Sequence, residues 1–202
     1  YEDCNDAATM RKDPILKISC DRKPESGDDL ASQPTLSRLE TGRTVRELNR
    51  LGWELVNVFI RRYQTPPKEI VLEFDSSDDP THGQQEFTEF NGYYDPKMYH
   101  PLLIGEGNSG HLITALLRPG NAHASKGACG ILRRLVKLLR IVWPNVKIYL
   151  RADAGFAIPE LYDLCEELGI VYTIGLITNS RLKKLNANNL AEAWDSYNQK
   201  RQ

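Results

Sequence analysis

Short runs of β-branched and aliphatic residues, each followed by a turn, recur from residue 70 onward. The run at 70–74 lies between Pro67 and an acidic turn, which is typical of a buried strand. Similar runs predict further strands at 100–104, 111–117, 146–150 and 170–176. The glycine-rich segment 105–110 joins two of these runs and predicts a hairpin.

Apolar residues at helical spacing separate the later strands. They predict a helix over 126–142 that Pro144 closes, and a second helix from 157 to Gly169, a natural residue for a helix C-terminus. The tail from Asn179 onward is also expected to be helical. Hairpin-linked strands are antiparallel, whereas crossover helices connect parallel strands. The order therefore predicts an α/β fold with a mixed five-stranded sheet and flanking helices.

The first third of the chain shows helix signals instead of strand-like runs. Asp13 before Pro14 predicts a helix N-terminus, and Thr44 with Glu47 has the spacing of a capping box. We therefore expect a helical N-terminal segment at 1–66, followed by the α/β core at 67–202.

Composition narrows the function classes. The chain has 202 residues, with 26 basic and 27 acidic side chains and a formal net charge of −1. This balance excludes a histone-like or polybasic nucleic-acid binder, although local basic patches remain compatible with it. No apolar run reaches the roughly 18 residues of a membrane-spanning helix, and the acidic first residues predict no signal peptide. Cysteines and histidines are dispersed, so no zinc cluster is expected.

Two aspartates directly follow predicted strands. Asp75 follows the first strand and Asp153 follows the fourth. Ligands of open α/β sheets gather at strand ends, so these carboxylates converge if the two strands are parallel neighbours. Converging carboxylates suit Mg²⁺ or Mn²⁺, and such a site can drive in-line displacement at phosphorus. The alternative is that both aspartates are ordinary turn residues.

Four segments follow one another along the chain, at residues 75–83 (DSSDDPTHG), 91–94 (NGYY), 117–121 (LRPGN) and 151–156 (RADAGF). Together they resemble the DDE-type transposases of bacterial insertion sequences, in the branch called transposase DDE domain group 1. The resemblance covers nearly the whole chain and implies a ribonuclease-H-like fold, with 67–202 as its catalytic core, incomplete at the C-terminus. It also implies metal-dependent cutting and joining of DNA at the ends of a mobile element.

The resemblance further implies the setting in which the chain works. The expected cofactor is Mg²⁺ or Mn²⁺, and the expected partner is double-stranded DNA, both element ends and target. We expect a homodimer or a higher synaptic complex of the full-length protein, in the bacterial cytoplasm near the nucleoid and without a membrane partner.

Matched to the family, Asp75 is the first acid of the triad and Asp153 the second. Asp78 and Asp79 compete with Asp75 for the first role, but Asp75 directly follows the strand. The family's third acid is a Glu in a Tyr-x2-Arg-x3-Glu-x6-Lys pattern, and this pattern is not found in the chain.

The missing pattern leads us to expect an internal or C-terminally truncated part of a transposase, which does not transpose DNA by itself. Two alternatives stay open. One is a catalytically dead remnant that at most binds DNA or a partner, and the other is a metal-dependent nuclease of the same fold.

Several cations are candidates for binding DNA. They are Arg118, Arg133, Arg134, Lys137, Arg140 and Arg151. The four at 133–140 share one helix face, which either contacts phosphates or is simply solvated. Arg118 and Arg151 flank predicted strand ends, where each can bind the DNA backbone or pair with a carboxylate.

Three other side chains lie near the predicted site. His82 can orient a phosphate or water, or serve only as a hydrogen-bonding residue of its loop. Tyr93 and Tyr94 can stack on flipped bases or pack against the sheet.

Overall fold

The computed structural model describes residues 6–81, 83, 85–95 and 97–201. Its contacts divide the chain into two compact units, Tyr1–Trp53 and Glu54–Gln202. The division falls inside helix α4 (Val45–Arg61). The expected limit of the catalytic core at residue 67 stays a prediction. No helix in the described part of the chain is both long and apolar enough to cross a membrane.

The first unit is helical, as expected. Its helices before α4 are α1 (Ala7–Met10), α2 (Pro14–Ser19) and α3 (Gln33–Thr41). The Asp13 carboxylate caps α2, since its Oδ1 accepts from the N–H groups of Ile15 at 2.8 Å and Leu16 at 3.0 Å. Thr44 and Glu47 form the predicted capping box at the start of α4, with the Thr44 N–H donating to Glu47 Oε2 at 2.8 Å.

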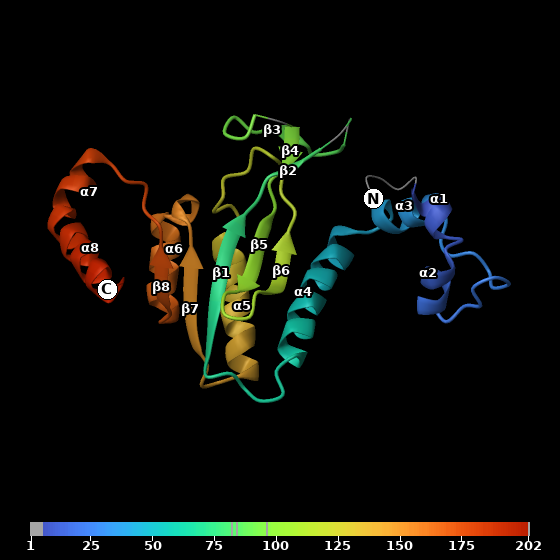
Figure 1. The fold of residues 1–202 in the computed structure, drawn as a ribbon, viewed down its shortest axis with the longest axis horizontal. Coiled ribbons are helices and arrows are strands. Elements are labelled where there is room, and N and C mark those ends of the chain that lie inside the picture. The colour runs from blue at the N-terminus through green and yellow to red at the C-terminus, as the bar shows by residue number, and fades with distance from the viewer. Residues whose placement is uncertain (1–5, 82, 84, 96, 202) are drawn as a thin grey trace. The chain divides into compact units, whose positions relative to one another are not determined.

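The second unit is built on a five-stranded sheet with the order β6-β5-β1-β7-β8 (Figure 1). The strands are β1 (Glu69–Ser76), β5 (Leu102–Glu106), β6 (His111–Leu116), β7 (Lys147–Ala152) and β8 (Val171–Ile174). The β1–β7 and β7–β8 pairs are parallel, whereas β5 is antiparallel to both of its neighbours. This is the mixed sheet expected of a ribonuclease-H-like fold, so the predicted fold class is confirmed.

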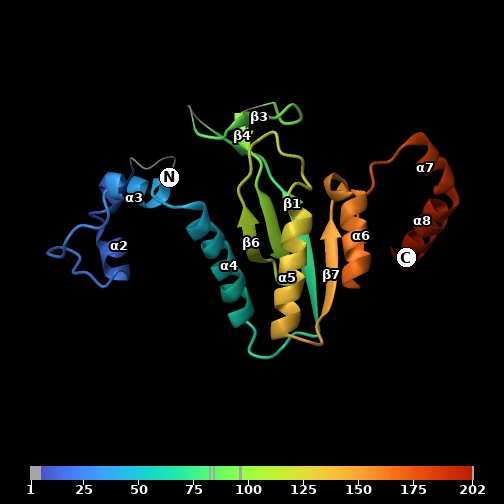
Figure 2. The ribbon, with the colours of Figure 1, turned by 180° about the vertical axis from the view of Figure 1, so that it is seen from behind.

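Helices α5 (Ala128–Val142) and α6 (Pro159–Leu168) connect the parallel strands and lie on the same face of the sheet (Figure 2). The alternating residues Ile70, Leu72 and Phe74 of β1 are fully buried. The Phe74 ring meets that of Phe156 edge-on, with centroids 6.2 Å apart. Phe156 belongs to a short 3-10 helix (Ala154–Phe156) after β7. Helices α7 (Ser180–Leu185) and α8 (Ala187–Arg201) follow β8.

The buried side chain of Glu106, the last residue of β5, stabilises the β5–β6 hairpin. Only 2% of this residue is exposed, and its carboxylate accepts from the N–H groups of Val71 at 3.2 Å and Ser109 at 2.7 Å. Burial opposes ionisation, but the hydrogen bonds from Ser109 and Val71 outweigh it and hold the pKa of Glu106 below its ordinary value.

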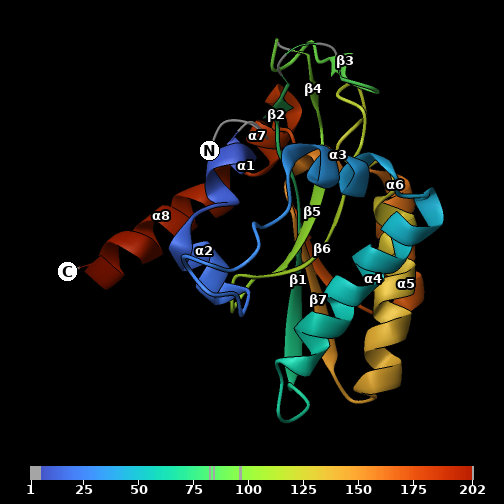
Figure 3. The same ribbon diagram turned by 90° about the vertical axis from the view of Figure 1, so that its right-hand side faces the viewer.

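A second sheet with the order β2-β4-β3 was not expected from the sequence. Its strands are β2 (Asp79–Pro80), β3 (Glu89–Phe90) and β4 (Lys97–Tyr99). They lie beyond the carboxyl end of β1, as the edge-on view in Figure 3 shows. We call these strands and the described residues between them the lobe.

Candidate active site

The register of β1 and β7 places the two predicted acids side by side. Phe74 is paired with Ala152 in this parallel ladder, so Asp75 and Asp153 come next at the same level. Neighbouring strands lie about 4.8 Å apart. Because Phe74 faces the buried side, Asp75 faces the opposite side of the sheet. The backbone at Asp153 is still extended, at φ −80° and ψ −175°, so its side chain continues the same alternation.

Each carboxylate accepts a backbone hydrogen bond through one oxygen, and the described residues give its other oxygen no hydrogen bond. Asp75 Oδ1 accepts the N–H of Ser76 at 2.8 Å, and Asp153 Oδ1 accepts the N–H of Gly155 at 2.9 Å. Both residues are exposed. Two fixed, exposed carboxylates are hard oxygen donors and fit Mg²⁺ or Mn²⁺. Among the described residues, however, no group of three His, Cys, Asp or Glu side chains is placed to hold a metal ion.

The other two candidates for the first acid occupy different positions. Asp79 belongs to β2, where it is paired with Tyr99 of β4 in the lobe. Asp78 lies between the two sheets and is exposed. Of the three aspartates, only Asp75 is at the level of Asp153 on the neighbouring strand. The catalytic roles of Asp75 and Asp153 stay a prediction.

Arg118 is buried and supports the loop that packs against the second acid. Its Nε donates to the His100 carbonyl at 2.7 Å, and its Nη1 donates to the carbonyls of Ala124 at 2.6 Å and Lys126 at 2.9 Å. A Cβ added to Gly155 would lie 2.8 Å from the Ala124 Cβ, so this loop fits closely over the Asp153 turn. Only 4% of Arg118 is exposed, and its expected contact with DNA stays a prediction.

Two further cations of the predicted set are held in ion pairs. Arg151 donates to Glu73 Oε1 from Nη2 at 2.7 Å and from Nε at 3.0 Å. Arg133 forms a two-pronged ion pair with Glu167 that links α5 to α6. The hydrogen bonds between Arg133 and Glu167 raise the pKa of Arg133 and lower that of Glu167. In each arginine the carboxylate occupies part of the guanidinium and offsets its charge, which weakens its attraction for a phosphate.

The rest of the predicted cations form one surface on α5, which we call the basic face. It consists of Arg134, Lys137 and Arg140. Within the described ranges, no ion pair involves any of the three. The basic face is therefore available to phosphates.

The lobe carries aromatic side chains close to the acids. Tyr93 is 87% exposed, which is incompatible with its packing against the sheet, and Tyr94 is 37% exposed. Phe87 and Phe90, at 77% and 55% exposure, share the lobe surface and were missed by the sequence reasoning. The clustering of four aromatic residues within 87–94 is visible in the sequence and could have indicated this surface. The role considered for His82 lies outside the described residues.

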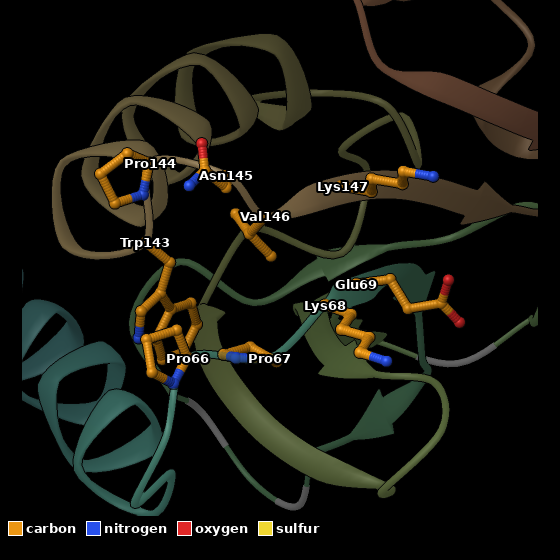
Figure 4. Close-up of a pocket in the computed structure, with 9 residues that line it drawn as sticks. All are labelled: Pro66, Pro67, Lys68, Glu69, Trp143, Pro144, Asn145, Val146 and Lys147. Atoms are coloured by element: carbon orange, nitrogen blue, oxygen red, sulfur yellow. The ribbon is translucent and has the colours of Figure 1, made fainter.

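A pocket of about 530 Å³ lies at the other end of the sheet, around the first residues of β1 and β7 (Figure 4). Glu69 and Lys147 line it and form the first pair of the β1–β7 ladder, whereas the acids follow the last pair. Trp143 and several prolines form its apolar wall. The pocket is therefore separate from the candidate active site.

Comparisons with known proteins identify one family and several similar solved structures. The family described as transposase DDE domain group 1 matches residues 1–202. One similar solved structure is the cryo-EM structure of the simian T-cell lymphotropic virus intasome in complex with PP2A regulatory subunit B56 gamma. It is 17% identical with a TM-score of 0.35, and the match covers 66% of this chain and 44% of that chain. The chain thus spans less than half of that structure's length, and a search of curated proteins found no match. The family match over its whole length shows that the chain belongs to the transposase DDE domain group 1 family.

Proposed function

We propose that this chain contributes the catalytic core of an insertion-sequence transposase, which cleaves and joins phosphodiester bonds at the ends of the element. The observation that carries the proposal is the β1–β7 register, which brings Asp75 and Asp153 to the same level on the exposed side of the sheet. The family match supports the same reading.

In this proposal Asp75 and Asp153 hold Mg²⁺ or Mn²⁺ through their carboxylate oxygens. A divalent cation there would supply Lewis-acid stabilisation of the charge that develops at phosphorus. The backbone N–H groups of Ser76 and Gly155 fix the direction of the two carboxylates. The basic face contributes phosphate contacts that hold double-stranded DNA. Multimeric assembly of the full-length protein on DNA, in the bacterial cytoplasm, belongs to the same proposal.

Manganese binding, measured by isothermal titration calorimetry, tests the site. Asp75→Asn and Asp153→Asn should each weaken Mn²⁺ binding at least about tenfold, because each removes one of two charged ligands. The matched control Asp79→Asn makes the same substitution at an aspartate of the lobe and should leave the affinity unchanged. A loss in Asp78→Asn with none in Asp75→Asn would move the first acid to Asp78. Equal affinity in all four variants would contradict the site.

A second candidate function is a remnant that binds DNA without cutting it. It is favoured by one observation, since no third acidic ligand joins Asp75 and Asp153 among the described residues. We expect the 202-residue chain by itself to give no strand-transfer product with DNA and Mg²⁺. Nicking of supercoiled plasmid that disappears in Asp153→Asn would favour the catalytic core, and DNA binding without nicking would favour the remnant.

A further inference from the structure

The lobe exposes an unusual amount of aromatic surface. Phe87, Phe90, Tyr93 and Tyr94 lie within one short segment, and Tyr93 is the most exposed of them at 87%. Large apolar side chains that gather on a surface mark a place where another molecule binds. The question is which molecule these rings fit.

The turn that carries the two tyrosines is fixed rather than loose. Asn91 Oδ1 accepts the N–H groups of Tyr93 at 2.9 Å and Tyr94 at 3.3 Å, and Asn91 Nδ2 donates to the Gly120 carbonyl at 2.6 Å. A Cβ on Gly120 would lie 2.3 Å from the Met98 carbonyl oxygen, so the strand of the lobe and the loop after β6 are in close contact. The backbone that carries the two rings is therefore fixed, and the rings meet edge to face, with centroids 4.9 Å apart and planes at 85°.

The same turn stands beside the acids. The Tyr94 ring centroid lies 5.9 Å from that of His100, a buried residue two positions before β5. Partial burial, then the charge of Asp78 and those of Asp153 and Asp75, raise the pKa of Tyr94. His100 lies three positions before Leu103, which is paired with Asp75 in the β1–β5 ladder, so the Tyr94 ring lies near the end of β1 that carries Asp75.

The neighbouring charge also fits a nucleotide. Lys97 is exposed on β4 and is paired with Phe90 across the β3–β4 ladder. A cation beside flat, exposed rings matches a phosphate next to a base, since bases stack on aromatic side chains while lysines hold the backbone. Only a base that has left the double helix can offer its face to such rings.

We propose that the exposed ring of Tyr93, supported edge-on by Tyr94, is a stacking platform for an unpaired nucleobase next to the phosphodiester at Asp75 and Asp153. This inference rests on the proposed function and names the form of DNA that the site takes, an end whose bases are splayed out. The rings set the position of the flanking nucleotide, and the carboxylates act on the bond beside it.

Fluorescence anisotropy in EDTA tests the platform without metal or catalysis. The probes are a labelled DNA hairpin with an overhang of unpaired thymines and the same hairpin with a blunt end. The intact chain should prefer the overhang, and Tyr93→Ala should weaken overhang binding about 5- to 150-fold while changing blunt-end binding little. Tyr93→Phe keeps the ring and should retain the preference. Trp194→Ala, which removes an exposed aromatic of α8, is the matched control and should also retain it.

The outcomes separate the platform from the proposed function. A preference for the overhang that survives in both Tyr93→Ala and Tyr94→Ala would overturn the platform and leave the metal site intact. Equal affinity of the intact chain for both probes would overturn it as well. If the intact chain binds neither probe, the proposed function fails together with the platform. Circular dichroism of each variant identifies any loss that results from unfolding.

Discussion

Gly155 offers a sharp test of how the second acid is positioned. In Gly155→Ala the new Cβ would lie 2.8 Å from the Ala124 Cβ and 3.1 Å from Asp153 Oδ1. Carbon atoms in contact prefer separations of about 3.5–4.0 Å, so the turn and the loop must separate by roughly 1 Å. Overpacking of this kind costs about 1–3 kcal/mol. The same movement shifts the Asp153 carboxylate, because its Oδ1 is bonded to the Gly155 N–H at 2.9 Å.

Thermal unfolding followed by circular dichroism measures the cost. At about 2–4 °C per kcal/mol for a domain of this size, Gly155→Ala should lower Tm by roughly 2–12 °C and also weaken Mn²⁺ binding. Gly130→Ala is the matched control, since its added Cβ meets nothing within 4 Å on the exposed side of α5. Alanine is favoured over glycine inside a helix by about 0.5–1 kcal/mol, so this variant should raise Tm. An unchanged or raised Tm in Gly155→Ala would refute the steric reasoning.

Three further predictions follow from groups described above. Glu106→Gln should lower the free energy of unfolding by about 1.5–3 kcal/mol at neutral pH, because amide donors lose a buried charged acceptor. The folded-state pKa of Glu106 is lowered, so its contribution to stability is present above the unfolded value of 4.5 and is lost as pH falls through the folded value. The free energy of unfolding of Glu106→Gln, measured with urea, should therefore change less between neutral and acidic pH than that of the intact chain. Arg118→Met should cost at least about 2 kcal/mol in the same assay, since it strips three carbonyls of a buried donor, and an unchanged midpoint would contradict the bracing role. Alanine at all three positions of the basic face should reduce the salt dependence of DNA binding by about one unit of slope per lost phosphate contact, whereas Arg133→Ala should leave the slope unchanged.

The main sheet could be predicted from the sequence because its strands and helices are long enough for their apolar residues to recur at a recognisable spacing. The helix predicted at 126–142 is α5, and its buried residues recur at helical spacing: Ala128, Leu132, Leu135, Val136 and Leu139. The second strand was placed early, at 100–104, whereas β5 is Leu102–Glu106. Pro101 offers no N–H to a ladder, and the carboxylate of Glu106 turns inward to accept hydrogen bonds, so a polar residue ends a buried strand.

The lobe and the role of Arg118 could not be predicted in the same way. Strands of two or three residues contain no period, and their pairing depends on contacts such as those of Met98, which is fully buried between β2 and β3. Arg118 is held by backbone carbonyls whose directions depend on loop conformation rather than on residue type. By contrast, the positions of Asp75 and Asp153 near strand ends could be predicted because they depend on local sequence, whereas their catalytic roles stay a prediction.

The β1–β7 register also indicates where this family can vary. The two acids belong to strands that are directly bonded to each other, so their proximity does not depend on the chain between β1 and β5. A slip of one residue within either strand would turn its acid to the covered side, whereas an insertion in the lobe leaves the ladder untouched. Relatives with longer or shorter lobes are therefore expected to keep the same acid pair while the surface beside it diversifies.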